Sequence, residues 1–251
     1  MTEMPHPAKP IADADAAAIA AMAVETSAVP RRNFYGRVHG KTLRSSQKTY
    51  LAEDLDALRL QGVSRQDNPA RLPIDPAAAL GAGPLWVEIG FGGGEHLVHM
   101  AQTYPAARLI GCEPFVNGIA MVLGKIRAAG VGNLAIHPGD ARDLFDVLPA
   151  ASVARAFLNY PDPWPKARHH RRRFVTPGYL TALARVMVPG AEFRIATDIA
   201  DYVRQALEQV PLAGFALEQQ SAAPWQDWLP TRYEIKALRE GRPPHYLTFR
   251  R

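Results

Sequence analysis

The residues with the clearest chemical potential lie between positions 156 and 173, AFLNYPDPWPKARHHRRR. A short apolar run over 156–158 predicts a buried strand, which the prolines that follow must end because proline donates no hydrogen bond to a sheet. An acid, an indole and five cations come next: Asp162, Trp164, Lys166, Arg168, Arg171, Arg172 and Arg173. The acid and the indole suit a planar polar ring, and the cations suit a phosphate backbone. This stretch indicates a nucleobase attached to nucleic acid.

A glycine-rich segment, VEIGFGGGE (87–95), closes one predicted strand and opens a predicted helix. Its candidate ligand-binding glycines are Gly90, Gly92 and Gly94, because glycine turns tightly and lets a ligand approach the backbone without a Cβ clash. Dinucleotide-binding folds and S-adenosylmethionine (SAM) enzymes share such turns, so the glycines alone do not choose between them. Glu88 precedes the turn, where it would repel a pyrophosphate and attract a cationic amino-acid tail. This acid favours SAM.

Two further acids end the next two predicted strands. Glu113 stands about 20 residues beyond the turn, where a carboxylate accepts hydrogen bonds from ribose hydroxyls. Asp140, in the run HPGD, ends the third strand and suits an adenine amino group. Any one of these acids reads as an ordinary loop carboxylate. Three at consecutive strand ends predict SAM rather than a nicotinamide as cofactor.

Charge also points to a polyanionic partner. The formal net charge is +5 and the pI is about 9.5. Six cations and no acid lie between Arg31 and Lys48, and five more cations lie between Lys166 and Arg173, so 11 of the 29 Lys and Arg residues fall in two short windows. A single basic run is as often a solvated surface. Two runs, one beside a candidate site, favour nucleic acid.

The rest of the composition indicates the cellular compartment of the protein. The only cysteine, Cys112, excludes an internal disulfide and sits in the strand-like segment RLIGC, where it reads as a small core residue. No apolar stretch approaches the roughly 18 residues of a membrane span, and no spaced set of Cys, His and carboxylates argues for a metal. We expect a cytoplasmic protein with no metal and no membrane association, and nothing indicates an obligate protein partner.

These side chains need an α/β scaffold to position them. Strands are predicted over 85–89, 108–112, 134–137, 153–158, 191–196, 215–219 and 246–249, and helices over 95–103, 115–129, 142–148, 177–187 and 199–210. Their alternation predicts a doubly wound, mostly parallel seven-stranded sheet with helices on both faces. The expected domains are a disordered Ala/Pro-rich head (1–29), a basic arm (30–62) and a catalytic domain (63–251).

The chain resembles the bacterial tRNA (guanine-N7-)-methyltransferase family from about Arg31 to the C-terminus. The resemblance is carried by the segments VEIGFGGGEH (87–96), GCEP (111–114), GDA (139–141), NYPDPWPKARHHRRR (159–173), RIATD (194–198) and TRYE (231–234). The glycine-rich turn is generic to class I SAM-dependent methyltransferases, whereas PDPWPK followed by basic residues is highly specific. The implied activity is methyl transfer from SAM to N7 of a guanine in the tRNA variable loop, conventionally position 46.

The resemblance also implies roles for individual residues. Cofactor contacts are implied for Glu88, Glu113, Asp140 and Asp162, and Asp162 is also the implied catalytic acid. Contacts to the guanine region are implied for Lys166, Asp198, Thr231, Arg232, Tyr233 and Glu234. RNA contacts are implied for Arg168, His169, His170, Arg171, Arg172 and Arg173.

Two alternatives remain open at the level of sequence. A SAM methyltransferase of a small nitrogenous metabolite would share the turn and the acids but would not need two basic windows. A noncatalytic RNA-binding subunit would keep the fold as a scaffold, but it would not need the acids at three strand ends.

Overall fold

A computed structural model describes residues 34–251, so the expected disordered head (1–29) lies outside the described residues. Its centre is a seven-stranded sheet of order β3-β2-β1-β4-β5-β7-β6 in which only β7 runs antiparallel to its neighbours. The strands are β1 (Leu85–Ile89), β2 (Arg108–Cys112), β3 (Leu134–His137), β4 (Val153–Asn159), β5 (Met187–Thr197), β6 (Ala216–Ser221) and β7 (His245–Arg250). The predicted doubly wound, mostly parallel sheet is confirmed.

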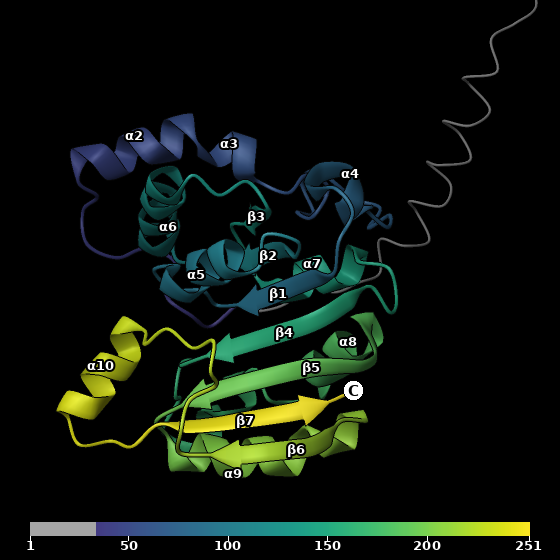
Figure 1. Cartoon of the computed structure of the whole chain (residues 1–251), viewed down its shortest axis with the longest axis vertical. Coiled ribbons are helices and arrows are strands. Elements are labelled where there is room, and N and C mark those ends of the chain that lie inside the picture. Colours follow the sequence, from purple (N-terminus) through teal and green to yellow (C-terminus); the bar gives the residue numbers. More distant parts are fainter. Residues whose placement is uncertain (1–33) are drawn as a thin grey trace, which may run out of the picture.

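Helices cover both faces of this sheet (Figure 1). The α-helices are α2 (Ser45–Glu53), α3 (Leu55–Leu58), α4 (Pro76–Leu80), α5 (Glu95–Thr103), α6 (Val116–Ala129), α7 (Ala141–Val147), α8 (Pro177–Val186), α9 (Ala200–Gln209) and α10 (Arg232–Arg239), and two 3₁₀ turns are η1 (Ala167–Arg172) and η2 (Pro211–Ala213). No helix among residues 34–251 is long and apolar enough to cross a membrane.

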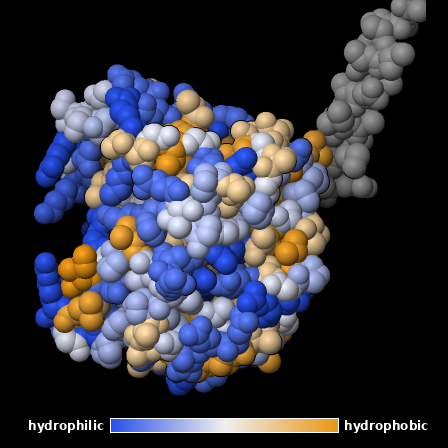
Figure 2. Space-filling model, viewed as in Figure 1, coloured by the Kyte–Doolittle hydropathy of each residue, from blue (hydrophilic) through white to orange (hydrophobic). Residues whose placement is uncertain are grey.

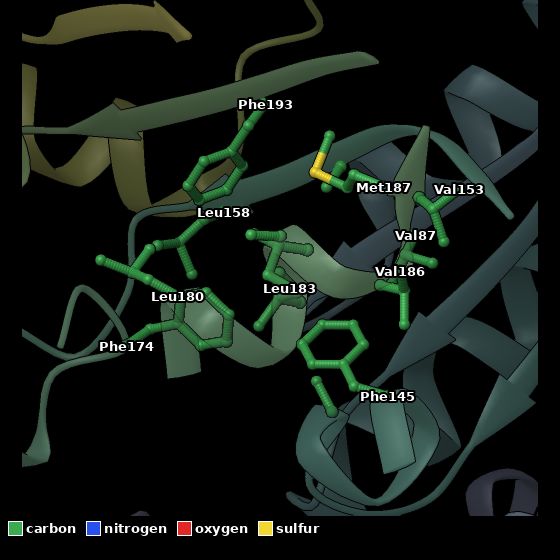
Figure 3. Packing of buried hydrophobic residues seen from close by; sticks show 14 of the residues in the cluster. Val87, Phe145, Val153, Leu158, Phe174, Leu180, Leu183, Val186, Met187 and Phe193 are labelled. Carbon is green, nitrogen blue, oxygen red and sulfur yellow. The ribbon is translucent and has the colours of Figure 1, made fainter. Parts of the chain in front are cut away.

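The two faces of the sheet bury separate hydrophobic clusters because successive side chains of a strand point to opposite faces. In β1, Val87 and Ile89 belong to the cluster under α7, α8 and α9, whereas Trp86 belongs to the cluster under α5 and α6. Figure 3 shows the first cluster, where Phe145, Leu183 and neighbouring side chains interdigitate. Both faces being apolar explains why β1 and β4 read as almost continuous apolar runs.

Three features differ from the sequence-based expectation. Strand β5 begins at Met187 instead of residue 191, because Met187 already has extended backbone (φ −79°, ψ 138°) and ends α8 one residue early. The basic run forms the 3₁₀ turn η1, and the insertion before β7 contains α10. The later part of the basic arm packs on the domain: Leu60 is buried and the Arg127 guanidinium of α6 lies 5.1 Å from the centre of the Tyr50 ring of α2.

Candidate active site

A cleft opens at the carboxyl ends of the parallel strands, between β1 and β4, where the strand order reverses. Open α/β sheets bind their ligands at this point, and Figure 1 shows that the arrowheads of β1, β4 and β5 lie on the same side of the sheet. The cleft has two adjoining cavities of about 210 and 650 Å³. Glu113, Asp162, Gly92, Trp164 and Tyr233 line both.

The glycine-rich turn forms the floor of the cleft. Gly90 and Gly92 line it with left-handed backbones (φ +70° and +57°). A Cβ at Gly90 would meet nothing within 4 Å, which leaves room there for a ligand, whereas the Tyr233 ring lies over Gly92. Gly94 does a different job, because a Cβ there would overlap Val122 of α6. This glycine therefore allows α5 and α6 to pack closely, and its expected cofactor contact stays a prediction.

Glu113 is held rigidly at the end of β2. One carboxylate oxygen accepts the Gly92 N–H at 2.7 Å and the other accepts the Phe115 N–H at 3.0 Å. Burial outweighs these hydrogen bonds and raises the pKa of Glu113 to about 7, with the charges of Asp162 and Glu88 adding to the rise. A buried acceptor tied to the glycine turn is well placed for the hydroxyls of a bound nucleoside.

Asp140 lines the first cavity and also begins α7. Its carboxylate accepts the Arg142 backbone N–H at 2.9 Å and is paired with the Arg142 guanidinium. The Arg142 guanidinium in turn lies 4.2 Å from the centre of the Tyr179 ring, which also lines the cavity. Asp140 thus reaches the predicted place, and its contact with an adenine amino group stays a prediction.

Asp162 faces both cavities from the loop after β4. Desolvation raises the pKa of the Asp162 carboxyl above its ordinary value, and the positive charge of Arg37 opposes this rise. The predicted catalytic acid therefore lies in the cleft with Arg37 as its opposing charge.

Glu88 does not line either cavity in the described part of the chain. Its side chain is 2% exposed, one oxygen lies 2.9 Å from His96 Nδ1, and the other accepts from the Asn159 side chain at 3.4 Å. The expected direct cofactor contact stays a prediction; in this structure the carboxylate lies beneath the turn and contacts His96 and Asn159. Glu88 instead connects β1, β4 and α5 under the cleft.

Some side chains of the TRYE segment (231–234) lie at the cleft and others lie in the interior. Tyr233 is 44% exposed and lies over Gly92. Thr231 is buried and caps α10 by accepting the Glu234 N–H at 3.3 Å. Glu234 is buried and accepts from Trp228 Nε1 at 2.6 Å and from the Tyr246 hydroxyl at 2.8 Å. In this structure both side chains hold α10, and direct guanine contacts by Thr231 and Glu234 stay predictions.

The other three residues expected near the guanine line neither of the two cavities. Arg232 pairs with Glu95 at 2.9 Å. Asp198, which follows β5, pairs with Arg242, and Lys166 is exposed beside η1. Their contacts with a substrate stay predictions.

The basic run does not act as one surface. Arg173 is fully buried and donates to the Pro163 carbonyl at 2.8 Å and to Asp201 at 2.8 Å, so its predicted RNA contact is wrong. The burial holds the loop after β4 against α9. His170 Nε2 lies 3.2 Å from the same Asp201 carboxylate. Arg168 and Arg171 remain exposed beside the cleft.

Sequence reasoning missed two parts of this basic loop. His169 packs edge-on against Trp164, with ring centres 5.9 Å apart, and Arg172 is half-buried and lines the first cavity. Sequence reasoning also missed Phe34, Tyr35 and Arg37, which reach the cleft from well before the first strand. Their signal was an aromatic pair followed by an arginine, FYGR, whose long-range partners cannot be inferred from the segment itself.

The residues present fit SAM as the cofactor. Gly90 leaves open space on the floor, the buried Glu113 carboxylate offers an acceptor, and Asp140 lies on the neighbouring strand end. Within residues 34–251, no group of His, Cys, Asp and Glu is arranged to hold a metal ion.

Comparison with known proteins identifies this arrangement. Residues 82–247 match the family model Methyltransf_4, described as "Putative methyltransferase". The chain is 71% identical to the tRNA (guanine-N(7)-)-methyltransferase of Cereibacter sphaeroides, with 88% of this chain and 91% of the relative covered. It is 69% identical to the enzyme of the same name from Paracoccus denitrificans, with 88% of this chain and 96% of the relative covered.

Solved structures share the fold at low sequence identity. The 16S rRNA methyltransferase KamB has a TM-score of 0.50 and 18% identity, covering 66% of this chain and 87% of that chain. An antibiotic-related methyltransferase has a TM-score of 0.51 and 16% identity, covering 76% of this chain and 98% of that chain. With the sheet order, the cleft and the close relatives in agreement, the chain belongs to the SAM-dependent tRNA (guanine-N7-)-methyltransferase family.

Proposed function

We propose that this protein transfers the methyl group of SAM to N7 of a guanine in tRNA, and that this guanine lies in the variable loop, conventionally at position 46. The observation that carries the proposal is the position of Asp162, which faces the same cleft as the glycine turn and Glu113, with exposed Arg168 and Arg171 on the adjoining turn. The close relatives that bear the activity in their names support the same substrate.

SAM supplies, when bound, an electrophilic methyl group on a sulfonium sulfur. Guanine N7 carries a lone pair and no proton at neutral pH, so no side chain needs to act as a strong general base. The work of the protein is to align the base and hold water away, and alignment of this kind accounts for much of the acceleration in bimolecular transfers. This agrees with a cleft that is walled by aromatic rings and in which Glu113 and Asp162 line both cavities.

Asp162 has two tasks in this proposal. Its ionised carboxylate accepts hydrogen bonds from the N–H groups on the Watson–Crick edge of guanine, which orients the base. The same negative charge stabilises the positive charge that grows on the purine as N7 is methylated. Because that charge is larger in the transition state than in the bound substrate, the interaction raises the rate and not merely the affinity.

The tRNA backbone meets the exposed cations of η1 and its approach, Lys166, Arg168 and Arg171. Phosphate contacts position a nucleic acid without reading its sequence. A small free metabolite would not use these cations, which lie outside the cleft. We place the activity in the cytoplasm, where tRNA is found, and assign it no obligate protein partner.

Two tRNA transcripts that differ only at position 46 test the proposal. We expect purified protein with methyl-labelled SAM to label the transcript with guanine 46 and to leave the adenine 46 transcript unlabelled. Equal labelling of both would move the site away from the variable loop. Labelling of free guanosine monophosphate as efficiently as tRNA would support the small-metabolite alternative.

A further inference from the structure

The residues before the first helix wall the cofactor cleft. Phe34 and Tyr35 line both of its cavities, and Phe34 and Val38 line a third of about 420 Å³ that also contains Asp140. We call residues 34–41 the strap. No sequence motif assigns this segment to the cofactor, yet three cavities at the strand ends share its side chains.

One end of the strap is fixed by backbone and amide hydrogen bonds. The Val116 N–H donates to the Val38 carbonyl at 2.9 Å. The Asn117 side chain accepts the Gly40 N–H at 2.8 Å and donates to the Lys41 carbonyl at 2.7 Å. Val116 and Asn117 form the first turn of α6, just after Glu113, so this end of the strap is tied to the element beside the cofactor acid.

The other end is held by a stack of side chains. The Arg172 guanidinium carbon lies 4.7 Å from the centre of the Tyr35 ring and 4.8 Å from the centre of the Trp164 ring. A planar guanidinium that contacts two aromatic rings gains a cation–π attraction from each. Arg172 thus links the strap to the loop that carries Asp162.

The Trp164 side of this stack is itself fixed. Trp164 has a left-handed backbone (φ +41°), which a bulky residue adopts only where its surroundings enforce it. The edge contact with His169 and the guanidinium of Arg172 hold the indole in place. Backbone strain of this kind, next to Asp162, is typical of a functional loop.

We propose that Tyr35 and Arg172 are positioning residues of the cofactor cleft: their stack with Trp164 clips the strap over bound SAM, so that Arg172 retains the cofactor instead of contacting RNA. The clipped strap also places Arg37 where its charge acts on Asp162. The inference rests only on the cofactor half of the proposed function and not on the choice of guanine or tRNA.

The clip makes cofactor release dependent on lifting the strap. Each exposed cation–π contact contributes about 0.5–1 kcal/mol, so losing both is expected to weaken cofactor binding by about 5- to 30-fold. Because closure slows escape, most of the change should appear as faster dissociation. An arginine that only touched RNA phosphates would leave cofactor binding unchanged.

Calorimetric titration of the full-length protein with S-adenosylhomocysteine, without RNA, tests the clip. We expect Arg172→Ala and Arg172→Lys both to raise the dissociation constant, since lysine keeps the charge but loses the planar stack. Tyr35→Phe should bind as the unmodified protein does, and Tyr35→Leu should behave like Arg172→Ala. Arg171→Ala removes the neighbouring exposed cation and should leave this dissociation constant unchanged. Stopped-flow displacement measures the dissociation rate of each variant.

The outcomes separate the clip from the proposed function. Wild-type cofactor affinity in Arg172→Ala, in a sample with an unchanged unfolding midpoint, would overturn the clip and leave the methyltransferase assignment intact. Failure of the unmodified protein to bind S-adenosylhomocysteine would overturn the assignment itself. Equal losses in Arg171→Ala and Arg172→Ala would also overturn the clip, because charge alone would then explain both.

Discussion

At the scale of single residues, the proposed methyl transfer depends most on Asp162. We expect Asp162→Ala to lower kcat for tRNA methylation by about 100-fold or more, a magnitude typical of removing one group that stabilises developing charge. Asp162→Asn should recover part of this loss, because its amide oxygen still accepts hydrogen bonds but carries no charge. Single-turnover kinetics with saturating SAM measure the effect.

The fold should survive this substitution. Burial raises the pKa of Asp162, so its ionised form costs folding free energy at pH values above the ordinary carboxyl pKa, and removing the group relieves that cost. We expect the unfolding midpoint of Asp162→Ala at pH 8 to equal or exceed that of the unmodified protein. Wild-type turnover in the variant would remove Asp162 from the site.

Glu113 gives the cofactor affinity a pH dependence. Burial raises its pKa to about 7 in the free protein, and a neutral carboxyl offers weaker acceptors to ribose hydroxyls than a carboxylate does. SAM binding should therefore tighten as the pH rises from 6 to 8, with a midpoint near 7 for the free protein. Glu113→Gln should bind SAM weakly at every pH, with a flat profile. Calorimetry at several pH values provides the test, and a pH-dependent Gln variant would assign the titration to another group.

Residue types predicted part of this site and missed part of it. Glu113, Asp140 and Asp162 could be found because each stands just after an apolar strand, and strand ends meet at one edge of a parallel sheet. Arg173 could not be told from Arg171, since only the fold shows which of two neighbouring arginines turns inward toward Asp201. The types and spacing of residues identify candidate site residues. The packing of the fold decides which of these residues lie in the cleft and which lie in the interior.

At the scale of elements, the strands were the most predictable features. β1, β2 and β3 match their predicted ranges because short apolar runs are bounded by Gly, Pro and charged residues. The turn η1 and the strap were not predicted, because their positions depend on partners far away in the chain, such as Asn117 for the strap. Local patterns carry no information about such contacts.

The approach of α5 to α6 gives a testable packing prediction. Gly94 and Gly130 both have left-handed backbones (φ +77° and +65°), but a Cβ at Gly94 would overlap Val122, whereas a Cβ at Gly130 meets nothing within 4 Å. Backbone strain lowers the unfolding free energy of both alanine variants, and overpacking lowers that of Gly94→Ala by about a further 1–3 kcal/mol. Chemical denaturation should show the larger loss of unfolding free energy in Gly94→Ala. Equal losses would mean that the helices adjust freely.

At the scale of the whole molecule, the face shown in Figure 2 is mostly hydrophilic and carries an apolar patch over α10. Ile235 and Leu238 of that helix are 42% and 53% exposed. The exposed cations Lys166, Arg168 and Arg171 are the proposed RNA contacts. The net charge of +5 adds a general attraction for tRNA to these local contacts.

A salt series separates local contacts from the general field. Each phosphate contact contributes about 0.7–0.9 to the slope of log affinity against log salt. The triple variant Lys166→Ala, Arg168→Ala and Arg171→Ala should therefore show a tRNA-binding slope shallower by about 2 to 3. Arg250→Ala serves as a control, because Arg250 ends antiparallel β7 at the opposite edge of the sheet. A change in slope for Arg250→Ala of about one third of that for the triple variant would attribute binding to net charge, because one charge is removed instead of three.

The most direct test of the central claim is the identity of the methylated nucleoside. Unmodified tRNA is incubated with SAM and the purified protein, digested to nucleosides and analysed by mass spectrometry beside a 7-methylguanosine standard. We predict 7-methylguanosine approaching one per tRNA with the unmodified protein, and a rate of formation lower by about 100-fold or more with Asp162→Ala. A methyl group on any other nucleoside, or no methylation of tRNA by protein that binds SAM, would contradict the central claim.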